Sequence, residues 1–405
     1  MKRFKRYLKF LSLIFIIFML TMSVFAVSGC VTVHAGERRP FEVLLQDVSA
    51  GLSHSLAIDI DGNIWAWGSN TALEGMNSSR TMGKLGNNSR DTFFAPVQIT
   101  WDTQFVSVAA GIRHSVALDS EGFIWIWGRI YVSQNGRTVR YSQMVPKKLN
   151  TEQRFQFVSA GSATLAIAVD GSLWAWGNND VGQLGDDTTV NRHTPTHILQ
   201  GLYFQAISIS SSSNLALDIH GNLWSWGYNF NGSLGDGTSI NRPMPVRLLP
   251  QTRFSAISSQ GTRFAWDIEG NLYAWGTNSN GQLGNGTIGG ISLPVRINTL
   301  ARFTYLSATT VRTIAIDSDG TLWAWGLNHG HSLGNGDSYL GVNNARNRHP
   351  NPIQISRVRF KTISVGLGYN LAIDVTGRLW SWGLNLNGVL GNGANDVHFS
   401  VPTRV

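Results

Sequence analysis

Short runs of alternating apolar and polar residues, bounded by turn sequences, recur along most of this chain. In the first complete example, Ser55–Asp59 alternates with the two-residue period of a half-buried β-strand. Asp61-Gly62-Asn63 then predicts a tight hairpin, because Asp-Gly readily adopts the positive φ of a two-residue turn. Ile64–Gly68 follows as the next strand, with its two aliphatic side chains on one face and its two tryptophans on the other.

Two more strands complete this unit. Val48–Gly51 is a short apolar strand that precedes the hairpin, and Pro96–Ile99 ends the unit. Proline lacks the N–H that a ladder requires, so a strand containing it is expected at the edge of a sheet. The unit therefore reads as four antiparallel strands, with the proline-containing strand outermost.

The aromatic strand that ends at Gly68 is one of seven near-copies along the chain. Steps of 60, 49, 50, 49, 50 and 57 residues separate them. A period in this range is typical of propellers and other repeat arrays. We therefore predict an all-β chain folded as a seven-bladed β-propeller with four-stranded antiparallel blades. The second aromatic residues of the copies, which we expect to pack between blades, are Trp67, Trp127, Trp176, Trp226, Trp275, Trp325 and Trp382.

A Gly-x-Leu-Gly element follows the aromatic strand in most units. Unit six has the variant His331–Gly334, and unit two lacks the element. With Val-Ser-Ala-Gly-x-x-His-Ser-x-Ala-Ile/Leu-Asp and Gly-x-x-Trp-x-Trp-Gly, this order resembles the repeat of the regulator of chromosome condensation family. The resemblance covers nearly the whole chain after the N-terminal segment and implies a seven-bladed propeller. It implies no single function, because the family includes exchange factors, chromatin binders and secreted inhibitors.

The N-terminal segment has the composition of a targeting sequence. Five basic residues within the first nine precede an apolar run from Phe10 to Val27. Val27-Ser28-Gly29-Cys30 resembles the lipobox of bacterial lipoproteins, in which the cysteine is lipidated and becomes the new N-terminus. We therefore expect a lipoprotein signal peptide at 1–29, a tether at 30–40 and the propeller at 41–405. The alternative is an uncleaved membrane anchor, since the run is close to the length of a membrane span.

Charge and cysteine content narrow the function classes. The formal net charge is +8, and loss of the five basic residues of the signal peptide leaves +3. Such a small, scattered excess is too weak for a nucleic-acid partner, so none is expected. Cys30 is the only cysteine, which excludes an intrachain disulfide.

Two loops between the third and fourth strands are longer than the others and predict a binding surface. From the motif-ending glycine to the proline of the fourth strand, unit one takes 28 residues and unit six takes 26, against 18 or 19 elsewhere. In a closed ring, units six, seven and one are neighbours, so both loops would occupy one arc of the rim. Their mixture of Arg, Met and aromatic residues is typical of interface centres, although a neutral insertion is the alternative. The candidate binding residues, with Lys84 beside them, are Met76, Arg80, Phe93, Phe94, Tyr339, Arg346 and Arg348.

No constellation in the sequence indicates catalysis, a metal or a cofactor. His54 and His114 occupy equivalent positions in adjacent units, but a metal site needs three or four convergent ligands, so structural hydrogen bonding is expected. A ring of strand-end carboxylates reads as hairpin capping rather than as acid–base machinery. These aspartates are Asp59, Asp119, Asp218, Asp267, Asp317 and Asp374, with Ala168 in the remaining unit.

Three function classes remain for such a chain. The first is a lipid-anchored module, a monomer that faces outwards from the cell membrane and binds an extracellular protein with its rim. The second is a cell-wall or carbohydrate binder that uses Tyr228, Phe230 and Tyr131 for stacking. The third and least favoured is a polysaccharide-acting lyase or hydrolase with a polar pocket on the axis. Ring closure by exchange of a strand between Phe41–Leu45 and Pro402–Val405 is left open.

Overall fold

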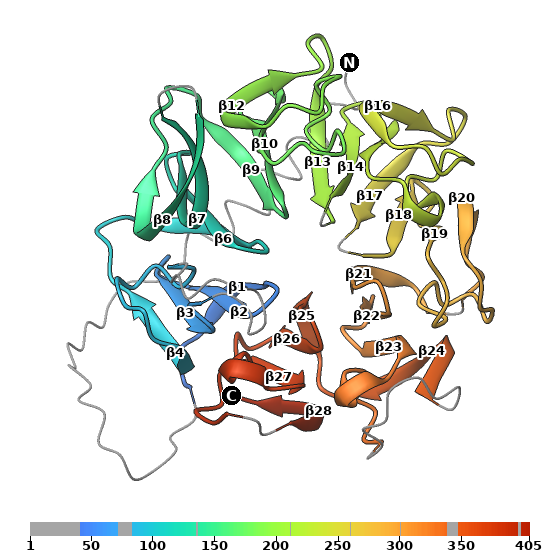
Figure 1. The fold of residues 1–405 in the computed structure, drawn as a ribbon. Coiled ribbons are helices and arrows are strands. Elements are labelled where there is room, and N and C mark those ends of the chain that lie inside the picture. The colour runs from blue at the N-terminus through green and yellow to red at the C-terminus, as the bar shows by residue number, and fades with distance from the viewer. Residues whose placement is uncertain are drawn as a thin grey trace, which may run out of the picture. The chain divides into compact units, whose positions relative to one another are not determined.

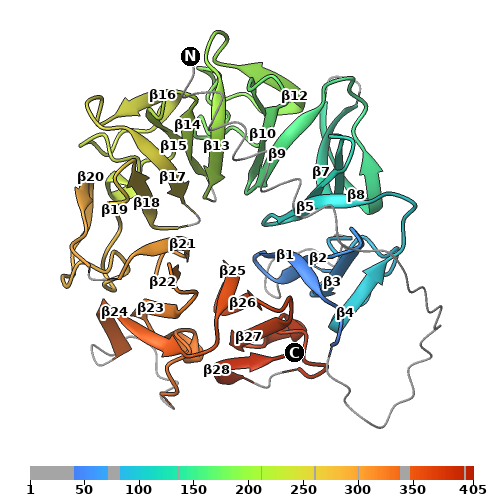
Figure 2. The ribbon, with the colours of Figure 1, turned by 180° about the vertical axis from the view of Figure 1, so that it is seen from behind.

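Seven four-stranded antiparallel sheets stand around a ring in the computed structural model. The fold class expected from the repeat is thereby confirmed. Within each sheet the strands are hydrogen-bonded in the order in which the chain makes them. Figures 1 and 2 show the first strand of a blade towards the centre and the fourth strand outside. The structure describes residues 41–71, 83–134, 137–210, 212–259, 261–299, 301–337, 347–395 and 398–405.

The first four blades lie in the first 248 residues. Blade 1 contains β1 (Leu45–Ala50), β2 (His54–Asp59), β3 (Ile64–Gly68) and β4 (Phe93–Ile99). Blade 2 contains β5 (Phe105–Ala110), β6 (His114–Asp119), β7 (Ile124–Gln134) and β8 (Arg137–Lys148). Blade 3 contains β9 (Phe155–Ala160), β10 (Ala163–Ala168), β11 (Leu173–Gly177) and β12 (Arg192–Ile198). Blade 4 contains β13 (Phe204–Ile209), β14 (Ser213–Asp218), β15 (Leu223–Gly227), η1 (Phe230–Gly232) and β16 (Arg242–Leu248).

The last three blades complete the ring. Blade 5 contains β17 (Phe254–Ser258), β18 (Arg263–Asp267), β19 (Leu272–Gly276) and β20 (Ile291–Arg296). Blade 6 contains β21 (Phe303–Ala308), β22 (Arg312–Asp317), β23 (Leu322–Leu327), η2 (His329–His331) and β24 (Arg348–Ser356). Blade 7 contains β25 (Phe360–Val365), β26 (Tyr369–Asp374), β27 (Leu379–Gly383), η4 (Leu386–Gly388) and β28 (Phe399–Arg404). Every fourth strand contains proline, as expected of an outer edge.

The second strands are buried on both faces, so the half-buried pattern expected for Ser55–Asp59 is wrong. All six residues of β2 are buried, and so are those of β6, β10, β14 and β26. The physical reason is that each blade lies between two others. Leu56 packs in the core shared with blade 2, while Ala57 packs in the core shared with blade 7. The small residues of the alternation face a neighbour instead of solvent.

The core of the molecule is divided among the seven junctions between blades. At each junction the second tryptophan of one blade packs against the second and third strands of the preceding blade. Trp127, for example, packs with Leu56 and Ile64 of blade 1. The alternation of the third strand produces this arrangement, because Trp67 and Ile64 of β3 point towards opposite neighbours.

The Gly-x-Leu-Gly element fills the space beside the tryptophan of the next blade, and we call it the Leu plug. In blade 3, Leu184 is fully buried and its N–H donates to Asn179 Oδ1 over 2.8 Å. The carbonyl of Gln183 accepts a 3.1 Å hydrogen bond from Trp226 Nε1. Gly185 has φ +81°, and a Cβ at this residue would lie 2.8 Å from the same nitrogen. Only glycine fits this contact.

Leu plugs with the same geometry occur in blades 1, 3, 4, 5, 6 and 7. The carbonyl before the plug leucine accepts from the next tryptophan at three other junctions, through Lys84, Gln282 and Val389. A buried asparagine accepts from the leucine N–H in every plug. These asparagines are Asn70, Asn179, Asn229, Asn278, Asn328 and Asn385. The fully buried leucines are Leu85, Leu184, Leu234, Leu283, Leu333 and Leu390.

Blade 2 departs from this pattern. Its third and fourth strands, β7 and β8, continue past Gly128 as a long antiparallel hairpin that pairs Arg129 with Ser142 and Ile130 with Tyr141. These residues are in a strand where the other blades have the buried asparagine and the Leu plug. Additional pairing between β7 and β8 thus takes the place of the Gly-x-Leu-Gly element that unit two lacks.

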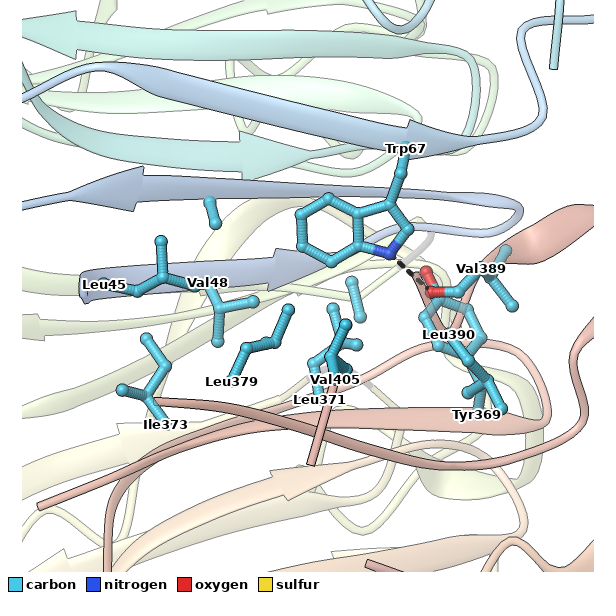
Figure 3. Close-up of a cluster of buried hydrophobic side chains, with 12 residues drawn as sticks. Leu45, Val48, Trp67, Tyr369, Leu371, Ile373, Leu379, Val389, Leu390 and Val405 are labelled. Atoms are coloured by element: carbon cyan, nitrogen blue, oxygen red, sulfur yellow. Dashed lines mark hydrogen bonds between the residues drawn. The ribbon is translucent and has the colours of Figure 1, made fainter. Parts of the chain in front are cut away.

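The ring closes without exchange of a strand, since the strands of blade 1 and of blade 7 each come from one continuous segment. The two ends still meet, because Phe41 N donates to the carbonyl of Val405 over 3.1 Å. Trp67 Nε1 donates to the carbonyl of Val389 over 2.8 Å (Figure 3), which repeats the bond found at Trp127, Trp226 and Trp325.

All of these junctions lie within one compact unit, Pro40–Val405. The unit holds the interblade cores and the ring-closing bonds, so it contains the described contacts that stabilise the ring, and we expect it to fold without residues 1–39. Among the described residues, no helix has the length and apolar character needed to cross a membrane.

Candidate functional site

One face of the propeller carries the loops in which the units differ. Because successive strands of a blade run in opposite directions, the turn between its first two strands and the loop between its last two lie at the same end. We call this end the loop face. Blade 1 packs against blade 7, and blade 7 packs against blade 6. The strands that bear the long loops of blades 1 and 6 therefore flank blade 7, and the described ends of both loops lie at the loop face.

The described members of the predicted binding set have different environments. Phe93 is partly buried and packs against the core between blades 1 and 2. Phe94 is 38% exposed and contacts blade 7, where its carbonyl accepts from Gly393 N over 2.8 Å. Arg348 begins β24 opposite Leu327 and is partly buried. The other predicted members, Met76, Arg80, Tyr339 and Arg346, lie outside the described residues.

Lys84 is removed from the binding surface by the structure. It occupies the x position of the Leu plug of blade 1, is 1% exposed, and donates from Nζ to Ser53 Oγ over 2.6 Å. Burial lowers its pKa to about 8. Lys84 is included in the predicted surface because it belongs to a long loop, and the length of a loop does not indicate which of its side chains are buried.

Two exposed leucines of blade 7 were missed by the sequence reasoning. Leu367, in the turn between β25 and β26, is 61% exposed, and Leu386 in η4 is 55% exposed. Both lie on the loop face in the blade between the two long loops. A partial signal existed for Leu386, because the corresponding loop position is Asp180 in blade 3 and Ser279 in blade 5, while blade 4 has the apolar Phe230 there.

An aromatic pair stands on the loop face of blade 4. Tyr228 and Phe230 are 43% and 60% exposed, and their rings stack at 6.1 Å with an interplanar angle of 4°. The two rings are parallel and exposed, and an exposed aromatic face is the kind of surface on which a sugar ring stacks. The side chain of Tyr131, the third residue of the predicted sugar site, lies outside the described part of the chain.

The strand-end aspartates cap their hairpins. Asp59 Oδ1 accepts from the backbone N–H of Asp61 and Asn63, and its Oδ2 accepts from Trp65 Nε1 over 2.9 Å. The same bonds recur at the other aspartates that precede a Trp-x-Trp strand. In blade 3, Ala168 takes the aspartate position, and Trp174 Nε1 donates to Ser172 Oγ instead. These carboxylates are saturated with local donors, so turn chemistry accounts for their recurrence.

The two histidines connect blades. His54 Nε2 lies 2.9 Å from Ser115 Oγ of blade 2, and His114 Nε2 lies 3.1 Å from Thr164 Oγ1 of blade 3. Burial lowers the pKa of both rings, that of His114 to about 4. Arg312, at the equivalent position of blade 6, donates to the carbonyl of Gly366 in blade 7. Side chains at this position therefore form hydrogen bonds between neighbouring blades. Among the described residues, no group of three potential metal ligands occurs.

Serines in or beside the first strands of the blades join neighbouring blades. The hydroxyl of Ser49 accepts from Ala110 N of the next blade over 2.9 Å. The same bond links Ser364 to Ala50, Ser208 to Ser259 and Ser307 to Val365. These hydroxyls stabilise the inner strands of the ring.

Residues 83–405 match the family model of the RCC1-like domain, and residues 46–72 match that of the regulator of chromosome condensation (RCC1) repeat. Mitochondrial RCC1 domain-containing protein RUG3 of Arabidopsis thaliana is 27% identical over 130 residues, 32% of this chain and 27% of the relative. Human regulator of chromosome condensation is 29% identical over 138 residues, 30% of this chain and 31% of the relative. The chain thus matches less than a third of the length of either relative.

Solved structures agree on the architecture. Prp20p from Saccharomyces cerevisiae, studied for its binding to Gsp1p and histones, superposes with a TM-score of 0.71 at 20% identity. The match covers 89% of this chain and 87% of Prp20p. Human WBSCR16 superposes with a TM-score of 0.67 at 18% identity, covering 83% and 89% of the two chains. At these identities the likeness shows the fold, while the match to the RCC1-like domain spans most of the sequence. The chain belongs to the RCC1-like domain family.

Proposed function

We propose that this chain is a binding module which presents the loop face of blades 6, 7 and 1 to a partner protein. RCC1-like propellers are a protein-interaction fold, and Prp20p is studied for its binding to Gsp1p and histones. The observation that carries the proposal for this chain is the exposure of Leu367, Leu386 and Phe94 between the two long loops. Exposed apolar side chains grouped beside variable loops are typical of a protein contact.

The first experiment compares two double variants in which exposed aliphatic residues of the loop face are replaced by serine. Leu367→Ser with Leu386→Ser should abolish capture of the partner from surface extracts. Val190→Ser with Ile240→Ser is the matched control, since these residues of blades 3 and 4 are 59% and 63% exposed on the same face. Equal capture by both double variants would exclude the arc at blades 6, 7 and 1.

A second experiment removes the long loops and keeps the Leu plugs. Residues 72–82 and 338–346 are replaced by short Gly-Ser linkers, which leaves Leu85 and the strand pairing of β24 in place. Loss of the partner with an unchanged unfolding midpoint is the expected result. Unchanged capture would show that the loops are neutral insertions.

We also propose that the module is exported and held at the outer face of a membrane by lipid on Cys30. The support is the basic and apolar N-terminal segment that ends in Val27-Ser28-Gly29-Cys30. Mass spectrometry of the mature N-terminus should find diacylglycerol on Cys30, and Cys30→Ser should remove it. A protein that begins at Met1 and stays in the membrane after this substitution would instead have an uncleaved anchor.

Carbohydrate binding is the second candidate, and the stacked pair Tyr228 and Phe230 favours it. Retention on purified wall polysaccharide that is lost in a Tyr228→Ala, Phe230→Ala variant would support it. A polysaccharide-acting lyase or hydrolase is the third and least favoured candidate.

A further inference from the structure

A cavity of about 580 Å³ lies between blades 2 and 3. Ile126, Ile130 and Leu149 line it from blade 2 and the linker that follows, and Ala163 and Trp176 line it from blade 3. Trp176 is the tryptophan that a Leu plug of blade 2 would cover, and blade 2 has extended strands in place of that plug. The cavity is therefore the space that a missing repeat element leaves at one junction.

The indole of Trp176 is less completely covered than the equivalent indoles of the other blades. Its exposure is 5%, whereas the six equivalent tryptophans are 0% or 1% exposed. Its Nε1 is buried and has no hydrogen-bond partner among the described residues. Trp275 and Trp382 also lack a partner for Nε1, but there Leu234 and Leu333 occupy the adjacent space. Among the tryptophans of this repeat position that the structure describes, Trp176 has both a buried unpaired Nε1 and a place in the wall of this cavity.

The charged residues around the cavity are all basic. Arg113, Arg129, Lys147, Lys148 and Arg192 line it, and no Asp or Glu does so among the residues described. Arg192 is paired with Asp186 at 2.7 Å, while the Lys148 ammonium lies 3.5 Å from the centre of the Phe123 ring. The lining thus combines an apolar wall, one buried N–H donor and a positive edge.

We propose that this cavity binds a small organic anion with an apolar body, of the class of medium-chain or aromatic carboxylates. Its volume falls in the range of small-molecule sites, which typically combine apolar walls with a few placed polar groups. An apolar chain would cover Ile126, Ile130 and the indole ring, which are the surfaces that the plug leucine covers elsewhere. A carboxylate would lie in the field of the lysines and arginines, and a small shift of the indole, whose Nε1 has no accessible surface in this arrangement, would let it accept from that nitrogen. This inference is independent of the partner proposed for blades 6, 7 and 1.

The experiment titrates the unit of residues 40–405 with sodium decanoate by calorimetry. One saturable site is expected, with binding of neutral decanol and of decyltrimethylammonium at least about tenfold weaker, the effect of a hydrogen bond to a charged group. Ile130→Trp should block the site without lowering the unfolding midpoint. Absence of saturable decanoate binding, or equal binding of all three ligands, would overturn the proposal.

Matched variants test the two polar features separately. Trp176→Phe removes the donor and should weaken decanoate about tenfold but leave decanol unchanged. Trp275→Phe is its control, because that nitrogen is unpaired beside a Leu plug. Lys148→Ala should weaken decanoate, whereas Arg247→Ala, at the corresponding register of blade 4, should not. Equal losses in a variant and its control would overturn the assignment to this cavity.

Discussion

Equivalent tryptophans have different neighbours at two adjacent junctions, the one between blades 3 and 4 and the one between blades 2 and 3. At the first, Leu184 is fully buried beside Trp226, and the carbonyl of Gln183 accepts from its indole. At the second, Trp176 borders a cavity, and its indole nitrogen has no partner among the described residues. The difference teaches that the aromatic strand positions the blades, while the Leu plug fills the junction and, in four of the six plugs, also supplies a carbonyl that accepts from the indole.

The largest expected effect separates the two junctions by packing. Trp226→Ala should lower the free energy of unfolding by about 3–5 kcal/mol, as expected for deletion of a fully packed indole. Trp176→Ala should cost at least about 1 kcal/mol less, because its ring already lacks neighbours on the cavity side. Urea unfolding of the unit 40–405 measures both values. Equal losses would mean that the cavity does not weaken the packing of Trp176.

Acid should act on the junction between blades 2 and 3 more than on the next one. His114 bonds Thr164 there, whereas the equivalent residue at the next junction is Ala163. Burial lowers the pKa of His114 from 6.5 to about 4, so the unfolded chain takes up a proton at a pH where the folded chain does not. Stability from this group is complete above pH 6.5 and is lost as pH falls towards 4, by about 3 kcal/mol in all.

Unfolding free energies measured from pH 7.5 to 4.5 check this dependence. His114→Gln should flatten the curve, because glutamine does not titrate in this range. His54 at the preceding junction has the same sign of pKa shift and leaves part of the slope. A curve unchanged by the substitution would contradict the assignment to His114.

The buried asparagine of the Leu plug should have the next largest effect. Asn179 Oδ1 accepts from Leu184 N, and its Nδ2 donates to Asp186 and to the carbonyl of Val190. Asn179→Ala leaves these buried groups unsatisfied and should cost about 2 kcal/mol. Asn178→Ala, one residue earlier and partly exposed, should change stability by less than about 0.5 kcal/mol. Similar urea midpoints for the two variants would show that the asparagine does not hold the plug.

Much of this frame could be predicted from the sequence because it rests on local rules. Alternation along Ile64–Gly68 placed Trp67 and Ile64 on opposite faces, and the repeat period gave seven blades. The burial of β2 on both faces could not be read this way, since a strand between two blades has no solvent face. The inward position of Lys84 depends on its place in the plug, not on its charge.

The sites were less accessible to sequence reasoning, for a related physical reason. The absence of a Leu plug in unit two was visible, but its consequence depends on Trp176 of the next blade, which is distant in sequence and adjacent in space. The exposure of Leu367 likewise depends on which neighbours cover the turn. Sequence repeats show where copies differ, and the structure shows which partner each difference leaves uncovered.

The smallest effect isolates the hydrogen bond of the plug. Trp226→Phe and Trp176→Phe remove the same atoms, but only the first breaks a bond, that to the carbonyl of Gln183. Beyond the difference that packing alone predicts, Trp226→Phe should therefore lose about 1 kcal/mol more of the free energy of unfolding than Trp176→Phe. Trp275→Phe supplies the packing term, because Trp275 is fully buried beside a Leu plug and its nitrogen is unpaired. If Trp226→Phe and Trp275→Phe lose the same amount, the indole bond contributes nothing to the junction, and the unpaired nitrogen of Trp176 carries no cost that a ligand could relieve.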